Sequence, residues 1–155
     1  MKQHNRRYKG SVFVDFFSED KTAKANFLSL YNALHNTYYE STTILKNIRL
    51  EQVVYMSFTN DVSYLVDDTI IILAEHQSTI NPNLSLRCLE YITRLYEHIQ
   101  SPRDRYSRTL EKISMPEFYV FYNGKEKIET NQTLKLSDAF IAQTSTPQLE
   151  LITGN

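Results

Sequence analysis

Glycine, cysteine and tryptophan are scarce in this chain of 155 residues, which holds three glycines, one cysteine and no tryptophan. Loops that cradle a nucleotide phosphate need several glycines, so we expect no nucleotide cofactor. The single cysteine, Cys88, excludes an intramolecular disulfide and a zinc site built from cysteines. Such sparse cysteine usage agrees with a reducing compartment.

Long apolar runs are also missing. The longest one, residues 70–74, is far too short to cross a bilayer. The first ten residues are basic, but no apolar segment follows them to make a signal peptide. We therefore expect a soluble, cytoplasmic protein with no membrane partner.

An excess of positive charge is absent as well, because 17 basic and 18 acidic residues give a net charge of −1. Any contact with nucleic acid must therefore be local. Two basic clusters could make it, Lys2 with Arg6, Arg7 and Lys9, and Arg103 with Arg105 and Arg108. Each cluster is either solvated surface or a set of phosphate contacts. We take Arg6, Arg7 and Lys9 as candidate DNA contacts.

Aromatic residues are abundant, with eleven tyrosines and eight phenylalanines, so we expect an aromatic-rich core. A chain of this length fits one domain. Within it we expect a basic, mobile arm at residues 1–10, a core at 11–125, and a tail at 126–155 with a short helix and a last strand.

Hydrophobic periodicity and turn residues predict the order α-β-β-β-α-β, which is typical of an α/β fold. The predicted helices are 18–36 and 81–100, a polar loop covers 38–46, and the predicted strands are 52–58, 62–66, 69–75 and 116–122. In the tail we expect a short helix at 137–142 and a strand at 149–152.

Polar residues end the most apolar strand, where Glu75, His76 and Gln77 follow the run 69–74. Alternation along a strand places Glu75 and Gln77 on one face and His76 on the other. Polar groups at the mouth of a sheet are costly unless they are paired or bind a metal. A solvated strand end is the plainer interpretation, and two acids fourteen residues apart, Asp61 and Glu75, do not exclude it.

The register of the 62–75 hairpin decides whether Asp61 joins Glu75. A two-residue turn at Asp67 and Asp68 pairs residue 61 with residue 74, which leaves the two carboxylates on opposite faces. A three-residue loop or one bulge pairs residue 61 with residue 75 and brings them together. A metal site needs the second register, and we predict it.

Several segments resemble those of one known family. They are residues 60–65, residues 72–83, Leu86-Arg87 with Tyr91, residues 116–124 and residues 136–140. In this order they resemble the Rpn family of recombination-promoting nuclease/transposase proteins, within the PD-(D/E)XK superfamily, over most of residues 12–152. The resemblance implies a restriction-endonuclease-like αβββαβ core, with a mixed central sheet flanked by helices. It also implies Mg²⁺-dependent DNA cleavage, with Mn²⁺ as a possible substitute.

The family motif can be carried over residue by residue. Asp61 matches the motif aspartate, Glu75 the second acid, and Gln77 stands in the lysine position. The resemblance also makes the backbone carbonyl of His76 the third metal ligand. Because a glutamine amide is neutral, Gln77 can orient water or donate a hydrogen bond to phosphate but cannot replace the lysine charge. The general base therefore stays unassigned.

Two further residues are candidates for the same site. Asp15, just before the first predicted helix, is preferred over Glu19 or Asp20 as an additional acid, although a surface turn would suit it equally. Arg87 is a candidate phosphate contact. Arg94 lies a heptad further along the same helix, and the glutamates Glu90 and Glu97 lie at pairing distance from these arginines, so ordinary salt bridges stay open.

We therefore expect a DNA endonuclease. Two alternatives remain open on the sequence, a catalytically weak or inactive module that binds DNA or a partner protein, and a purely structural dimerisation module. A homodimer is compatible with all of them.

Overall fold

A computed structural model describes residues 13–40, 45–47, 62–77, 81–122 and 132–154, without the side chains of 18, 47, 70–77 and 154. Its helical elements are the π-helical turn η1 (Asp15–Glu19), helices α2 (Ala23–His35) and α3 (Leu84–Ile99), and the 3-10 turns η2 (Asp104–Tyr106) and η3 (Leu136–Ala139). Its strands are β1 (Leu45–Asn47), β2 (Val62–Val66), β3 (Thr69–Gln77), β4 (Met115–Tyr122), β5 (Thr133–Lys135) and β6 (Ile152–Gly154).

The strands form one mixed sheet in the order β1-β2-β3-β4-β6-β5. β3 pairs with β4 and β4 with β6 in parallel, and the other neighbours are antiparallel. The predicted α/β class is confirmed, and α2, β1, β2, β3, α3 and β4 follow one another as α-β-β-β-α-β. The strand predicted at 52–58 lies outside the described residues.

β1 occupies a segment that we predicted to be loop. Its pairing with β2 opposes Leu45 to Val66, and Leu45 is buried. The polar composition around it favoured a loop, but the neighbouring strand and the buried leucine side chain override that preference.

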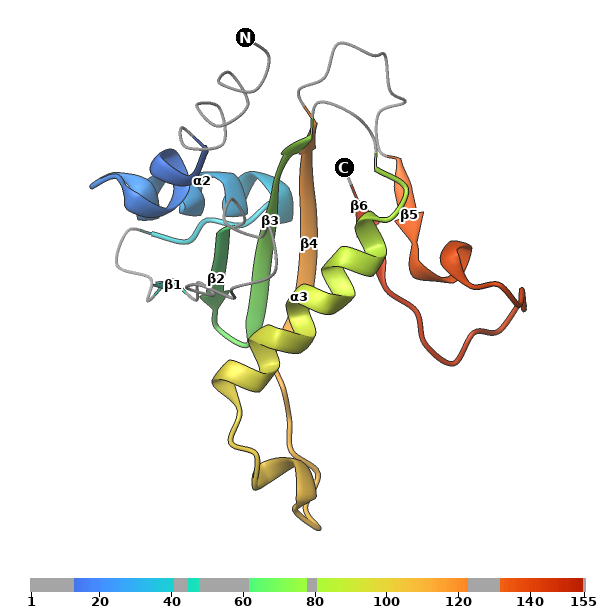
Figure 1. The fold of residues 1–155 in the computed structure, drawn as a ribbon. Helices are drawn as coiled ribbons and strands as arrows, with labels where there is room; N and C mark the ends of the chain where they lie inside the picture. The colour runs from blue at the N-terminus through green and yellow to red at the C-terminus, as the bar shows by residue number, and fades with distance from the viewer. Residues whose placement is uncertain (1–12, 41–44, 48–61, 78–80, 123–131, 155) are drawn as a thin grey trace, which may run out of the picture.

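Helices cover both faces of the sheet (Figure 1). On one face, Phe27 and Leu28 of α2 pack against Val62, Tyr64 and Val66 of β2, which alternate along the strand. On the other, the buried stripe of α3 packs against Phe118 and Val120 of β4. The two hydrophobic clusters make a three-layer α/β/α arrangement.

The first predicted helix is shorter than expected, because α2 begins at Ala23 and residues 15–19 form the separate turn η1. Asp20 separates the two elements, since one of its carboxylate oxygens accepts hydrogen bonds from the backbone N–H of Thr22 at 2.7 Å and from its hydroxyl at 2.8 Å. α2 ends at Asn36 in the left-handed conformation, with φ of 51°. Such local capping decides helix ends more finely than hydrophobic spacing does.

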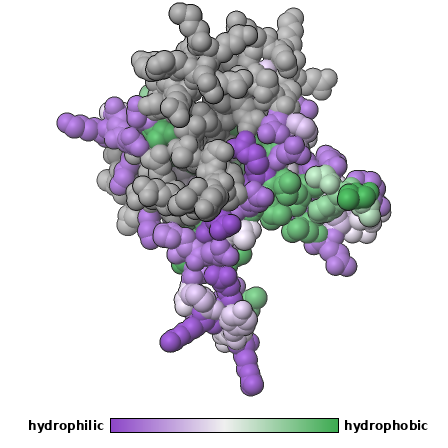
Figure 2. Space-filling model, in the orientation of Figure 1, coloured by the Kyte–Doolittle hydropathy of each residue, from purple (hydrophilic) through white to green (hydrophobic). Residues whose placement is uncertain are grey.

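The C-terminal segment completes the sheet, because β6 pairs with β4 and β5 pairs with β6. β6 begins at Ile152, later than the predicted strand at 149–152, and η3 covers only part of the predicted helix at 137–142. Leu134 and Leu151 pack against the α3 cluster, so this segment shares the core. Figure 2 shows a hydrophobic patch on its outer side, and its exposed large hydrophobic residues are Ile141, Leu149 and Ile152.

Residues 100–114 connect α3 to β4 and project away from the sheet (Figure 1), and we call them the finger. Every residue from 101 to 113 is exposed. Across the described ranges, none of the helices combines the length and the apolar character that a membrane span requires.

Candidate functional site

Glu75, His76 and Gln77 are the last three residues of β3, which lies between β2 and β4 inside the sheet. Ala74 pairs with Val120 of β4, but the next recorded pair is Gln77 with Tyr122. Three steps along β3 therefore match two steps along β4, which is a one-residue bulge. Strict alternation, from which we predicted that Glu75 and Gln77 share a face, does not run through this segment. Their side chains lie outside the described part.

The predicted hairpin register is wrong over the described part of the hairpin. Val66 pairs with Thr69 and Val62 with Leu73, so Asp67 and Asp68 form a two-residue turn. Asp67 has φ of 50°, a conformation that aspartate tolerates and that tight hairpins require. Asp61 itself lies just outside the described residues, so its own pairing is not part of this finding.

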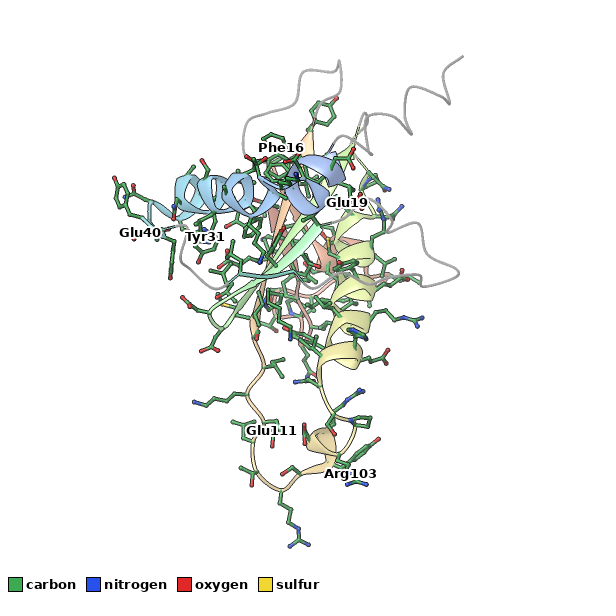
Figure 3. The ribbon with its side chains drawn as sticks, turned by 90° about the vertical axis from the view of Figure 1, so that its left-hand side faces the viewer. Phe16, Glu19, Tyr31, Glu40, Arg103 and Glu111 are labelled. Atoms are coloured by element: carbon green, nitrogen blue, oxygen red, sulfur yellow. The ribbon has the colours of Figure 1, made fainter. Side chains whose placement is uncertain are left out.

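A group of aromatic rings places η1, and Asp15 with it, at the end of the sheet where β3 and β4 finish. The rings of Phe13 and Phe17 lie 5.6 and 6.3 Å from that of Phe121. Phe121 is the residue of β4 between Val120 and Tyr122, at the level of the bulge. Figure 3 shows η1, marked by Phe16 and Glu19, at this upper end of the molecule.

Two hydrogen bonds hold the backbone of η1 in place. The Tyr64 hydroxyl donates to the carbonyl of Phe17 at 2.7 Å, and the Asn26 amide donates to the carbonyl of Phe16 at 2.9 Å. Asp15 is exposed, and its backbone carbonyl accepts from the Asp20 N–H at 2.8 Å. A π-helical turn is rare and is frequently found at functional sites.

Asp20 and Glu19 are the alternative acids. The hydrogen bonds from the backbone and side chain of Thr22 lower the pKa of Asp20. This carboxylate therefore already accepts two hydrogen bonds from the residue that precedes α2. Glu19 is exposed at the last position of η1. The preference for Asp15 over Asp20 and Glu19 stays a prediction.

The candidate phosphate contacts are described only in part. Arg87 is half-buried in the first half of α3, and this helix begins at the end of the sheet where β3 finishes (Figure 1). A helix N-terminus at this end favours a phosphate group. Arg94 is exposed, and no ion pair joins it to another described residue, so the expected salt bridges to Glu90 and Glu97 are absent. Arg6, Arg7 and Lys9 lie outside the described residues.

The structure also assembles a titratable cluster that the sequence did not reveal. Nε2 of His35 lies 2.6 Å from a carboxylate oxygen of Glu117, and Nδ1 lies 3.0 Å from the carbonyl of Tyr31. The Tyr119 hydroxyl donates to the same Glu117 oxygen at 3.0 Å. The predicted strand already put Glu117 and Tyr119 on one face, but nothing in the sequence connects His35, 82 residues away, to them.

This cluster shifts the ionisation of its tyrosines. Burial, and then the Glu117 carboxylate, raise the pKa of Tyr119 to about 12. Burial, followed by the charges of Glu117 and Asp67, also raises the pKa of Tyr31. Nδ1 of His35 faces the Tyr31 carbonyl and Nε2 faces the Glu117 carboxylate, so both ring nitrogens are engaged within the protein. The cluster therefore joins the end of α2 to β4 and leaves no ring nitrogen for a substrate.

Among the described side chains, no group of three histidines, cysteines, aspartates or glutamates is arranged to hold a metal ion. Asp61 and the side chain of Glu75 lie outside the described part of the chain, so the predicted ligand set stays a prediction.

No protein-family model matches this chain, and neither a curated protein nor a solved structure shows significant similarity to it.

Proposed function

We propose that this protein is a Mg²⁺-dependent DNA endonuclease of the recombination-promoting nuclease/transposase type, with a restriction-endonuclease-like core. The observation that carries the proposal is the one-residue bulge in β3 between Ala74 and Gln77. Bulges between parallel strands are uncommon, and bulges in general are enriched next to active sites. This one coincides with the only segment of β3 in which polar residues follow an apolar run.

The bulge also bears on how Asp61 and Glu75 could meet. With the two-residue turn, the uninterrupted register would pair residue 61 with residue 74. An extra residue in β3 shifts by one the alternation of all later positions. Asp61 and Glu75 can share a face only if the alternation of side chains shifts by one residue. The bulge can provide this shift, whereas the two-residue turn does not.

The donor set fits the metal. Two carboxylates and a backbone carbonyl are hard oxygen ligands of the kind that Mg²⁺ and Mn²⁺ accept. In the proposed site Asp61, Glu75 and the carbonyl of His76 hold the ion, which when bound polarises the phosphate and lowers the pKa of water. Gln77 donates a hydrogen bond to phosphate or orients water.

The proposal gives supporting roles to Asp15, Arg87 and the basic arm. Asp15 comes to the same end of the sheet through the contacts of Phe13 and Phe17 with Phe121. Arg87 enters from α3 with the favourable end of the helix dipole. In the proposal, Arg6, Arg7 and Lys9 of the basic arm contact DNA phosphates.

The test is cleavage of supercoiled plasmid by the purified protein with Mg²⁺ or Mn²⁺. We expect Asp61→Ala and Glu75→Ala each to reduce cleavage on the order of 10²-fold or more. The matched controls Glu97→Ala and Asp138→Ala remove exposed carboxylates elsewhere and should cleave as the unaltered protein does. Thermal melts establish that all four variants fold. Cleavage that persists in both Asp61→Ala and Glu75→Ala excludes this site.

Gln77 allows a second, independent test. Gln77→Lys restores the usual residue of the motif and should keep or increase cleavage, whereas Gln77→Ala should reduce it, because only the former keeps a hydrogen-bond donor at that position. Equal activity of the two variants would show that residue 77 has no part in the reaction.

The hairpin register favours one alternative, a module with this fold that binds DNA or a partner protein and cleaves weakly or not at all. Val62 paired with Leu73 is the register that keeps Asp61 and Glu75 apart if it continues. This alternative predicts DNA binding without Mg²⁺, no cleavage, and binding unchanged in Asp61→Ala.

A further inference from the structure

The finger is a long connection with almost no packing of its own. Its fifteen residues, 100–114, join the end of α3 to the start of β4. Its only regular structure is the three-residue turn η2, and connections of this length with so little regular structure are uncommon in compact domains and are usually functional. Tyr106 and Leu110 are 90% and 86% exposed, so the finger has no buried core to account for its sequence. What it presents to solvent is therefore the feature to explain.

Its charge differs in sign from that of the rest of the chain. The finger carries the cations Arg103, Arg105, Arg108 and Lys112, and the anions Asp104 and Glu111. Four positive and two negative charges give +2, and since the whole chain has a net charge of −1, the remainder carries −3. Within the described residues, none of the four cations lies within ion-pair distance of a carboxylate. The positive charges are thus available to a partner.

The surface of the finger is mainly hydrophilic and partly hollowed. Figure 2 shows it as a hydrophilic projection with an isolated hydrophobic spot. A hollow of about 560 Å³ lies along it, and its lining includes Arg105 and Arg108, the hydroxyl residues Ser107 and Thr109, and also the two acids Asp104 and Glu111. Figure 3 shows Arg103 and Glu111 on opposite limbs of the finger. Guanidinium groups beside hydroxyl groups are donors suited to phosphate oxygens.

We infer that the finger binds the phosphate backbone of duplex DNA, as a contact separate from the proposed cleavage site. The inference takes DNA as the ligand from the proposed function. α3 has 16 residues and so separates the two ends of the molecule by about 24 Å, at 1.5 Å per residue. The finger therefore adds affinity without touching the bond that is cleaved. Backbone contacts of this kind carry no sequence preference of their own.

The experiment measures binding of a fluorescent 30-base-pair duplex, by anisotropy in EDTA, across a series of salt concentrations. The variant R103Q/R105Q/R108Q should bind about tenfold or more weakly at low salt, and the slope of log affinity against log salt should fall by roughly two to three. R103K/R105K/R108K keeps the charges and should retain most of the affinity. Tight binding by the lysine variant separates loss of charge from loss of structure.

The matched control is K24Q/K46Q/K135Q, which removes three exposed cations from α2, β1 and β5. It makes the same change in net charge and should bind nearly as the unaltered protein does. Equal loss in both triple variants would mean that only total charge matters and would overturn the inference. So would undiminished binding by R103Q/R105Q/R108Q, or no measurable binding by the unaltered protein.

A second copy of the chain is the competing partner for the finger. Sedimentation without DNA tests it, because a change of oligomeric state in R103Q/R105Q/R108Q with unchanged DNA affinity would assign the finger to self-association and refute the DNA contact. Since binding is measured in EDTA, cleavage plays no part. If DNA binding depends on the finger but the plasmid assay with Mg²⁺ or Mn²⁺ shows no cleavage, the proposed function is refuted and this inference stands.

Discussion

The two faces of the sheet are held by different kinds of contact. On the α2 face, hydrogen bonds cross between elements, from Tyr64 to the Phe17 carbonyl and between His35 and Glu117. On the α3 face the contacts are mainly apolar. On this side of the sheet, the hydroxyls of Ser85, Tyr122 and Thr153 are buried and have no hydrogen-bond partner in the described part of the chain. Two hydrogen bonds are exceptions, a pair of 2.8 Å between the hydroxyls of Ser63 and Tyr91 and a bond of 2.6 Å from the Tyr96 hydroxyl to the Ser114 carbonyl.

The difference shows how each face positions its share of the proposed site. Directional hydrogen bonds determine where η1 and the end of α2 lie, because each donor must meet one particular acceptor. Apolar burial is not directional and holds α3 through its area and shape. η1, which carries Asp15, is thus placed by these hydrogen bonds together with the aromatic contacts of Phe13 and Phe17, and α3, which carries Arg87, by apolar packing. Substitutions on the two faces should therefore have different consequences.

The largest effects should come from the residues at the centre of each face. Phe27 of α2 and Leu95 of α3 are both fully buried. Phe27→Ala should lower the free energy of unfolding by about 3–5 kcal/mol, and Leu95→Ala by about 2–5 kcal/mol, because each leaves a cavity. Urea denaturation measures both. If the faces are independent, the losses add within about 0.5 kcal/mol in the double variant. A larger departure would show that the sheet couples them.

Tyr64→Phe should have the next largest effect, because it leaves the Phe17 carbonyl without its donor at a buried tyrosine. We expect a loss of about 1–3 kcal/mol. Tyr39→Phe is the matched control, since it removes a 2.8 Å hydrogen bond to Asp67 at an exposed position. It should cost less than about 1 kcal/mol. Equal losses in urea denaturation would mean that the buried position is not what matters on the α2 face.

The tyrosine cluster predicts a pH dependence on the α2 face. Tyr119 titrates at about 10 in the unfolded chain, whereas its folded pKa is raised to about 12. Between those values the unfolded chain has lost a proton that the folded chain keeps, so stability falls as pH rises. The fall cannot exceed about 1.4 kcal/mol per pH unit, and solvent screening reduces the total to about 1–2 kcal/mol.

Denaturation of Tyr119→Phe at several pH values measures this contribution. Its stability should fall less steeply than that of the unaltered protein between pH 10 and pH 12, and the two curves should run parallel below pH 10. Tyr31, whose pKa is also raised, remains in both proteins and leaves a residual slope. Identical slopes throughout would contradict the assignment.

The smallest effects should come from the buried hydroxyls on the α3 side. Ser85→Ala and Thr153→Val remove groups that have no partner among the described residues, so we expect changes between zero and about 1 kcal/mol of stabilisation. Ser63→Ala is the contrasting control, because it takes a partner from the Tyr91 hydroxyl and should destabilise. Clear destabilisation by Ser85→Ala or Thr153→Val would show that these hydroxyls have partners after all.

Local patterns predicted several elements well. The hairpin strands at 62–66 and from 69 onward and the strand at 116–122 agree closely with β2, β3 and β4, because alternation and turn residues are local signals. Some errors arose where contacts distant in sequence decide. β1 exists through its pairing with β2. The start of α2 was missed for a local reason, since it follows the hydrogen bonds between Asp20 and Thr22, two residues further on. The proposed site contains one feature of each kind. Local patterns placed its residues at the end of a strand, but the faces on which they lie depend on a bulge that those patterns did not reveal.

The sequence itself determined β2, β3, α3 and β4 and their order, because hydrophobic spacing and turn residues act within a few positions of one another. The sequence also identified β3 as the strand that ends in polar residues. Only the tertiary structure decided the bulge between Ala74 and Gln77 and the meeting of His35 with Glu117. Each of these depends on how strands and helices far apart in the chain pack together. The sequence of one strand or helix does not specify which other element will pack against it, or in which register.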